Sequence, residues 1–226
     1  TLTVTTVDSG SNTAVVVAAA NAFLDTLNSS QKVVGASALD SSTVLFGNAQ
    51  SNAVAWSHLP GSRHGLRLNT AVMSATQLNA ANALIAAALS SAGATQVSEI
   101  RVTDDVVATA MPTSGTGAEF YSIAFIGQPS LTQAWTLQLT GHQLTHNITY
   151  NAARVSATPM YLGAQPPNWT FGSGGSYLLN NATTGTQHAP METQRQAVSA
   201  LATAVQSSTV TAAAAKLSVN LSDLMF

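Results

Sequence analysis

Two histidines, His142 and His146, stand four residues apart in the segment GHQLTHNITY at residues 141–150. On a helix, this spacing places two imidazoles on one face, where they can bind one zinc or copper ion. On a strand the two rings also share a face, but residues four apart lie ~13 Å from each other. The β-branched and aromatic residues around His146 favour a strand. We therefore do not expect this pair to bind one ion together.

His142 by itself is a candidate metal ligand or catalytic residue. We predict a divalent-metal site, for copper or zinc, that is centred on His142. Its other ligands would come from other elements, and His188, Glu192 and His64 are the candidates. The alternative is an internal histidine that is hydrogen-bonded across a sheet. We interpret His146 as a structural or exposed residue.

Three more residues are predicted to bind a ligand or partner. Arg63 and His64 lie together in a loop that contains glycine and proline, and an arginine can bind a carboxylate or sulfate there. The alternative for Arg63 is a loop arginine that bonds backbone carbonyls or pairs with an acidic side chain. Trp169 can stack on the flat face of a sugar, whereas Trp56 and Trp135 are expected to be core or semi-buried anchors.

Several familiar chemistries have no motif in this chain. G-x-S-x-G, H-E-x-x-H and P-loop patterns are absent from the sequence. Asp104 and Asp105 are adjacent on a predicted helix, so their carboxylates do not face each other as an acid pair. The sequence has 0 cysteines, which excludes thiolate metal sites, cysteine nucleophiles and disulfides.

The composition indicates an extracellular protein. Only 7% of the 226 residues are charged and the net charge is −2, against roughly a quarter charged in average soluble domains. Nucleic-acid binding is not expected, because no basic patch is present, and no apolar run reaches the ~20 residues of a membrane span. Among the N-x-[ST] sequons, Asn168 and Asn181 are the expected glycosylation sites, and Asn147, in a predicted strand, is the poorest acceptor.

The elements that must position these residues follow from hydrophobic periodicity. Helices are expected over residues 12–27 and 95–110, and near 191–205 and 209–217. A further helix, the second along the chain, is expected to start at a capping box formed by Ser74 and Gln77 and to run to about residue 91. Gly93 is expected to end the second helix. Strands are expected at 1–7 and then over about 119–161, and residues 151–153 form a hairpin turn. Residues 164–190 are expected to be a long loop. We predict an α+β fold, with an antiparallel sheet flanked by N-terminal and C-terminal helices, in a single domain over residues 1–226.

The segments WSHLPGSRHGLRL, YSIAFIGQPS, GHQLTHN and TPMYLGAQP resemble the uncharacterised DUF3500 family over about residues 20–205. The matching positions are Trp56, Ser57, Pro60, Arg63, Gly65, Gly127, Pro129, Ser130, Trp135, Gly141, His142, Asn147, Thr158, Pro159, Gly163, Ala164 and Pro166. This chain departs from the family pattern at Gln143, where members have a second histidine, and at Gln165, where they have glutamate. Members also continue into a C-terminal His-x-His segment, so the resemblance implies either that this protein has lost much of a family metal site or that the chain is truncated at its C-terminus.

Two functions remain open at this point. The first is a secreted protein of unknown activity with a divalent-metal site at His142, beside the 164–190 loop. The alternative is a non-catalytic structural or binding module of an extracellular assembly, with carbohydrate or further copies of the chain as partners. Low surface charge suits such packing, because few charges need to be desolvated. Gln143 and Gln165, which stand where the family has histidine and glutamate, favour the alternative.

Overall fold

The computed structural model describes residues 11–36, 39–61, 63–171, 177–179 and 185–206. Contacts between residues divide the chain into two compact units, Thr1–Gln165 and Pro166–Phe226. We describe each unit by itself. The strand predicted at residues 1–7 and the helix predicted at 209–217 lie outside the described residues.

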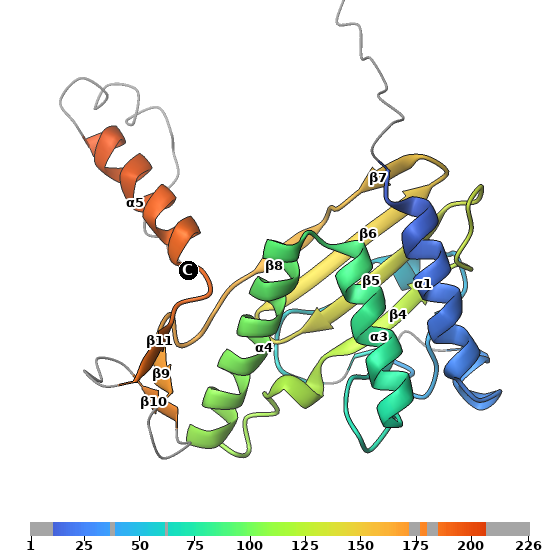
Figure 1. Cartoon of the computed structure of the whole chain (residues 1–226), viewed down its shortest axis with the longest axis horizontal. Coiled ribbons are helices and arrows are strands. Elements are labelled where there is room, and N and C mark those ends of the chain that lie inside the picture. Colours follow the sequence, from blue (N-terminus) through green and yellow to red (C-terminus); the bar gives the residue numbers. More distant parts are fainter. Residues whose placement is uncertain (1–10, 37–38, 62, 172–176, 180–184, 207–226) are drawn as a thin grey trace, which may run out of the picture. The chain divides into compact units, whose positions relative to one another are not determined.

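The first unit is built on an eight-stranded sheet (Figure 1). Its strands are β1 (Val34–Gly35), β2 (Leu45–Phe46), β3 (Leu66–Arg67), β4 (Ser122–Ile126), β5 (Trp135–Gly141), β6 (Leu144–Asn151), β7 (Arg154–Ser156) and β8 (Met160–Leu162). The main path runs β1-β2-β4-β5-β6-β7, while β3 also pairs with β4 and β8 also pairs with β6.

The predicted antiparallel sheet over residues 119–161 is confirmed only in part, because the whole sheet is mixed. Strands β4 to β8 are antiparallel, with Leu137 opposite both Phe125 and Ile148. However, β1 is parallel to β2, and β2 is parallel to β4. These two N-terminal strands have two residues each, which is too short to show a period of two in the sequence.

Three helices accompany this sheet: α1 (Thr13–Thr26), α3 (Ala75–Ala88) and α4 (Ser91–Ala110), while α2 is the single turn Gln50–Ala53. The capping box at Ser74 and Gln77 is confirmed, with both reciprocal hydrogen bonds present. The prediction that Gly93 ends α3 is wrong. The side chain of Ser90 accepts a hydrogen bond from Gly93 N–H at 3.1 Å and so starts α4 directly after α3. Ser90 is thus the N-cap that the Gly93 prediction overlooked.

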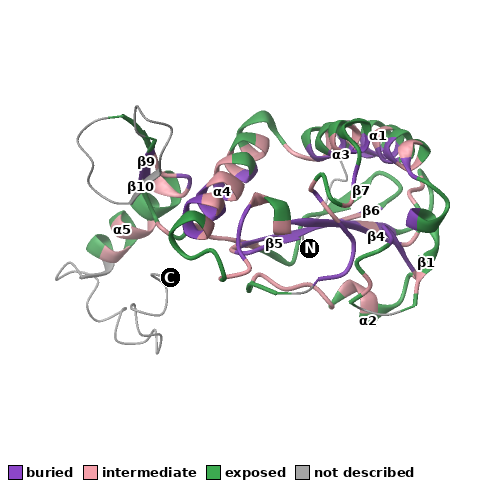
Figure 2. Ribbon diagram, turned by 90° about the horizontal axis from the view of Figure 1, so that it is seen from below, coloured by how far each residue is buried: buried purple, intermediate pink, exposed green. Residues whose placement is uncertain are grey.

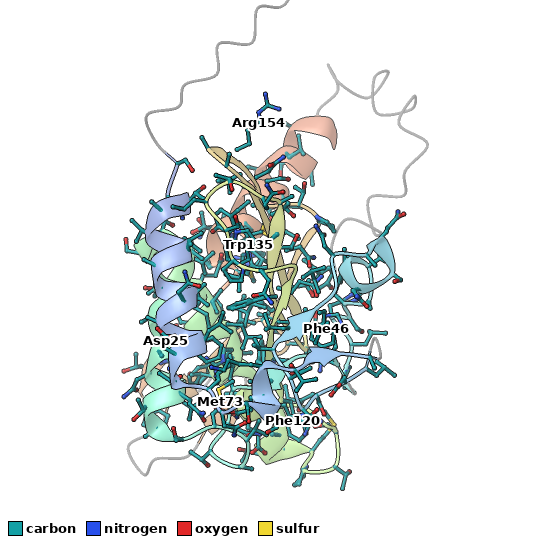
Figure 3. All side chains as sticks on the ribbon, turned by 90° about the vertical axis from the view of Figure 1, so that its right-hand side faces the viewer. Asp25, Phe46, Met73, Phe120, Trp135 and Arg154 are labelled. Carbon is teal, nitrogen blue, oxygen red and sulfur yellow. The ribbon has the colours of Figure 1, made fainter. Side chains whose placement is uncertain are left out.

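Helices α1 and α3 lie side by side on one face of the sheet (Figures 1 and 2). Trp135 is the largest side chain of this face and is 1% exposed. Its ring stacks on Tyr150 at 5.0 Å and meets Phe125 edge-on, and Phe125 in turn meets Phe23 of α1. Figure 3 shows Trp135 between this helical layer and the sheet, and Phe46 on the opposite side of the sheet.

The opposite face is also buried, although it carries many polar side chains. Loops between β1 and β3 and the segment before β8 cover it, and Phe46 forms an apolar cluster there with Ala124 and Ile126. The polar side chains on this face that are at most 3% exposed are Ser122, Gln138, Thr140, Thr145 and Asn147. The alternation of apolar and polar residues along β5 and β6 therefore separates two buried layers.

The second unit corrects the prediction of a long loop at residues 164–190. That segment contains β9 (Trp169–Phe171), β10 (Tyr177–Leu179) and β11 (Thr186–His188), paired in the order β10-β9-β11. The helix predicted near 191–205 is α5 (Glu192–Gln206). Across the described parts of both units, no helix combines the length and the apolar character that crossing a bilayer requires.

Candidate functional site

His142 lies at a hairpin tip. Strand β5 ends at Gly141 and β6 begins at Leu144, and these two residues are paired, so His142 and Gln143 form the turn between the strands. Gln143 has a φ of 59°, a left-handed conformation that closes the turn. The strand conformation assumed for His142 is therefore wrong, whereas His146 lies on β6 as predicted.

The His142 imidazole is bonded to a carboxylate of helix α4. Its Nδ1 lies 2.5 Å from Oδ1 of Asp104, and the two side chains are only 10% and 3% exposed. Because an ionised carboxylate only accepts hydrogen bonds, Nδ1–H is the donor, and in a neutral ring the lone pair then lies on Nε2. Nε2 forms no hydrogen bond with the described part of the chain. The expected bond across the sheet is thus replaced by a bond to a helix.

Asp104 is itself held by backbone. Its Oδ2 accepts from Gly117 N–H at 3.3 Å, and the neighbouring Asp105 accepts from Ala118 N–H at 2.7 Å. The segment before β4 therefore folds back onto α4 and fixes both carboxylates. Burial raises the pKa of Asp105, because a charged carboxylate is poorly solvated there.

Tyr121 fixes the other side of the hairpin tip. Its hydroxyl donates to the carbonyl oxygen of His142 at 2.6 Å, and its ring lies against Gly141, where a Cβ would overlap the ring. This close approach is a reason for glycine at position 141. Burial, together with the negative charge of Asp104, raises the pKa of Tyr121 far above its usual value, so the hydroxyl stays a donor.

The turn is also anchored to two neighbouring segments. Gln143 N–H donates to the carbonyl oxygen of His58 at 2.8 Å, and Gly163 N–H donates to the carbonyl oxygen of Gln143 at 2.7 Å. The Gln143 side chain accepts from Tyr161 OH at 3.1 Å, and the Tyr161 ring stacks on His58 at 4.1 Å. Gln143, which departs from the family pattern, thus serves the turn through hydrogen bonds.

Arg63 and His64 are buried in the loop before β3, with 5% and 1% exposure. The Arg63 guanidinium donates to the carbonyl oxygens of Ser57, Leu59 and Gly61, which is the alternative considered for this residue. Burial lowers the pKa of Arg63, and the negative charge of Asp104 opposes that shift. His64 Nε2 lies 2.5 Å from Oε1 of Gln138. His64 therefore contacts β5 at Gln138, and its role as a further ligand beside His142 stays a prediction.

His146 faces the apolar layer under α3. Ile85, Leu139 and Ile148 surround it in a small pocket, and it is 8% exposed. Burial lowers its pKa, because the charged imidazolium is poorly solvated there. Of the two interpretations offered for His146, a structural residue matches this environment and an exposed one does not.

The remaining predicted site residues belong to the second unit. Trp169 is buried and its ring stacks on His188 at 4.0 Å, with the two residues paired across β9 and β11. Glu192 bonds Arg195 and Gln196 on its own helix, and these hydrogen bonds lower the Glu192 pKa to about 2. Asn168 is exposed, whereas Asn181 lies outside the described residues.

Within the described residues, no group of three or more histidine, cysteine, aspartate or glutamate side chains is arranged to hold a metal ion. The first unit therefore offers His142 as a candidate ligand whose geometry is set by Asp104. Metal binding at His188 and Glu192 stays a prediction.

Asp104 and Tyr121 were missed as site residues. A signal for Asp104 is present in the sequence, because it follows Val97 and Ile100 on the buried stripe of α4, where a carboxylate requires a partner. Nothing local in the sequence pairs it with His142, which is 38 residues away. Tyr121 carries no signal beyond its position before a strand.

The fold and this site define a mixed-sheet α/β protein with a buried carboxylate–histidine pair at a hairpin tip. A family model for DUF3500, described as a protein of unknown function, matches residues 9–222. The chain therefore belongs to the DUF3500 family, as its motifs predict. Searches of curated proteins and of solved structures find no match. Of the positions that carry the resemblance, Arg63, Gly141, His142 and Gly163 surround the hairpin tip or form it.

Proposed function

We propose that this DUF3500 protein is a secreted protein that binds a divalent transition-metal ion, zinc or copper, through Nε2 of His142. The observation that carries the proposal is the buried contact of 2.5 Å between Nδ1 of His142 and Asp104. Histidines that bind metals usually donate their other ring N–H to a carboxylate or carbonyl, which fixes the tautomer and makes the ligand nitrogen more basic. Asp104 provides this arrangement before any ion binds.

The rigidity of the hairpin tip supports the same proposal. Backbone hydrogen bonds from Gln143 and Gly163, and the hydroxyl of Tyr121, hold the turn on three sides. A ligand ring that is already oriented loses little conformational freedom on binding. The proposal assigns one protein ligand, and it leaves the other coordination positions to water or to groups outside the described part of the chain.

A matched set of asparagine variants tests the proposal. In His142→Asn, an amide replaces the imidazole close to Nδ1 and can still donate to Asp104, but no atom remains at the position of Nε2. We expect wild-type protein to bind zinc or copper in calorimetric titrations, and His142→Asn to lose that binding while its melting temperature changes little. His58→Asn is the control and keeps the metal. An unchanged stoichiometry in His142→Asn, or a wild-type protein that binds neither ion, contradicts the proposal.

Three further variants separate the ligand from its support and from the other predicted ligands. Asp104→Asn keeps an acceptor for Nδ1–H but removes the charge, and changing a group that orients a metal-binding histidine lowers metal affinity by about 10–100-fold. His188→Asn and Glu192→Gln test the other two ligands predicted from the sequence. If either one abolishes binding while His142→Asn does not, the ion belongs elsewhere in the chain.

The second candidate is a non-catalytic structural or binding module of an extracellular assembly, and the carbonyl contacts of Arg63 favour it. Arg63 is used to fix a loop and not to bind a ligand. By the same reasoning, the neighbouring Asp104–His142 contact has the single role of attaching the hairpin to α4. On this account no metal binds, and the protein self-associates or adheres to a polysaccharide in a concentration-dependent way. A strict monomer by analytical ultracentrifugation that binds no polysaccharide contradicts this second candidate.

Secretion is part of the proposal and is supported by the exposure of the sequon at Asn168. Asn147 is only 3% exposed and its amide donates to Pro159 O at 2.8 Å. A glycosyltransferase therefore cannot reach this side chain in the folded protein. Intact mass and peptide mapping of protein from a glycosylating host should find a glycan at Asn168 and none at Asn147. Absence of a glycan at every sequon removes this support.

A further inference from the structure

An open groove of about 390 Å³ lies along one side of α4 in the first unit. It neighbours the Asp104–His142 pair but does not include either residue. The lining residues are Leu68, Asn69, Thr70, Leu78, Arg101, Asp105, Ala108, Thr116, Gly117, Ala118 and Glu119. The groove thus combines three charged side chains with an apolar side, in a chain whose charged fraction is only 7%.

Arg101 is a cation whose hydrogen-bonding capacity is incompletely used. Its guanidinium lies 5.6 Å above the ring of Tyr121, and Nη2 donates to Ala118 O at 3.3 Å. The Nε atom is buried and has no hydrogen-bond partner within the described part of the chain. Arg101 also forms no ion pair with any described carboxylate. A half-buried guanidinium of this kind is suited to an incoming carboxylate.

Two carboxylates line the same groove and restrict what can bind there. Asp105 follows Arg101 by four residues, so the two side chains share one face of α4. Glu119 is exposed in the segment before β4, which Asn69 holds through a hydrogen bond to the Glu119 carbonyl. A ligand that carried only negative charge would be attracted by Arg101 but repelled by Asp105 and Glu119. A ligand with both charges on neighbouring atoms is favoured by all three residues.

We propose that this groove binds a free α-amino acid with an apolar side chain. The α-carboxylate contacts Arg101, the α-ammonium contacts Asp105 and Glu119, and the side chain packs on Leu68, Leu78 and Ala108. A peptide carries its two terminal charges far apart and places only one of them in the groove. The site shares no ligand atom with His142, so it stands or falls independently of metal binding.

Three ligands of nearly equal size test the charge requirement: L-leucine, N-acetyl-L-leucine, which lacks the ammonium, and L-leucinamide, which lacks the carboxylate. In calorimetric titrations of the whole chain, we expect saturable binding of L-leucine with a dissociation constant below about 1 mM, and at least about tenfold weaker binding of both analogues. No saturable binding of leucine overturns the proposal. Equal binding of L-leucinamide also overturns it, because Arg101 then has no role.

Charge-removing variants locate the site. Asp105→Asn retains an amide oxygen that can accept from Ala118 N–H, and Glu119→Gln changes an exposed side chain, so both are expected to fold. Each should weaken leucine binding by about tenfold or more, and Arg101→Met should abolish it. Asp25→Asn, at an exposed position of α1, is the control and should bind leucine as the wild type does. Unchanged affinity in both Asp105→Asn and Glu119→Gln contradicts the assignment, even if Arg101→Met does not fold.

Discussion

The two faces of the large sheet are both buried, but their side chains are stabilised in different ways. Under α1 and α3, Trp135, Phe125 and Phe23 pack through aromatic contacts, and the layer is almost entirely apolar. On the opposite face, Gln138 donates to Ala53 O at 2.8 Å and its Oε1 contacts His64. The apolar face derives its stability from the area that it removes from water. The polar face depends on whether each buried group finds a partner.

Hydrogen-bond partners are incomplete on both faces, and on the apolar face Trp135 Nε1 is buried without one in the described part of the chain. Thr145 Oγ1 and Asn147 Oδ1 are buried without a hydrogen-bond partner in the described part of the chain. Each such group costs about 1–3 kcal/mol relative to a satisfied one. The contrast teaches that the polar side of a strand does not have to face solvent, and that its stability then depends on the hydrogen-bond partners of each buried group.

The largest effect is expected from removing the central side chain of the apolar face. Trp135→Ala should lower the free energy of unfolding by about 3–5 kcal/mol, because it leaves a cavity under α1 and α3. Gln138→Ala, on the same strand but the opposite face, should cost about 1–3 kcal/mol through the lost bonds to Ala53 and His64. Urea denaturation measures both, and a larger loss in Gln138→Ala would reverse the comparison.

A smaller effect is expected at the end of the apolar face, where the hairpin turns. Gly141→Ala places a methyl group into the ring of Tyr121, and the displacement should cost about 1–3 kcal/mol. It should also disturb the bond from Tyr121 OH to His142. Gly47→Ala is the control, because its nearest neighbour would be 3.8 Å away, and it should change stability by less than about 0.5 kcal/mol. Equal melting temperatures for both variants would contradict the close approach of Tyr121.

Because His146 is buried on the apolar face, we expect the free energy of unfolding to depend on pH. Burial lowers its folded-state pKa below the usual 6.5, so below that pH the unfolded chain binds a proton that the folded chain resists. The unfolded state then binds more protons, and the free energy of unfolding falls as pH decreases, by up to about 1.4 kcal/mol per pH unit. His146→Leu should have a flatter profile from pH 7.5 downwards. Identical slopes for the two proteins would show that His146 is not buried as a neutral ring.

The smallest effect is expected on the polar face. Thr145→Val removes a hydroxyl that is buried and unpaired, so stability should stay equal or rise by up to about 1 kcal/mol. Thr136→Val is the matched control, because Thr136 shares a hydrogen bond of 2.8 Å with Thr149, and it should cost about 0.5–1.5 kcal/mol. Opposite signs for the same substitution would sharpen the comparison, and two equal losses would contradict it.

The sequence predicted the elements that have a clear period and missed those defined by pairing at a distance. Helices α1, α3 and α4 and the antiparallel strands were foreseen from periodicity and from the cap at Ser74. The short strands β1, β2, β3 and β9 to β11 were not, because two or three residues show no period and no predicted hairpin turn links these strands to a longer one. His142 was found as a candidate by its residue type. Its partner Asp104 was not found, because the contact joins a helix and a hairpin tip through tertiary packing alone.

The central claim is that Asp104 fixes the His142 ring with its proton on Nδ1 and leaves Nε2 for a metal ion. The most direct test is a long-range ¹H–¹⁵N NMR spectrum of the histidine rings, recorded at neutral pH before and after the addition of zinc. We expect a proton on Nδ1 of His142 and a zinc-induced change in the Nε2 resonance. A proton on Nε2, or a His142 spectrum that zinc leaves unchanged, would contradict it.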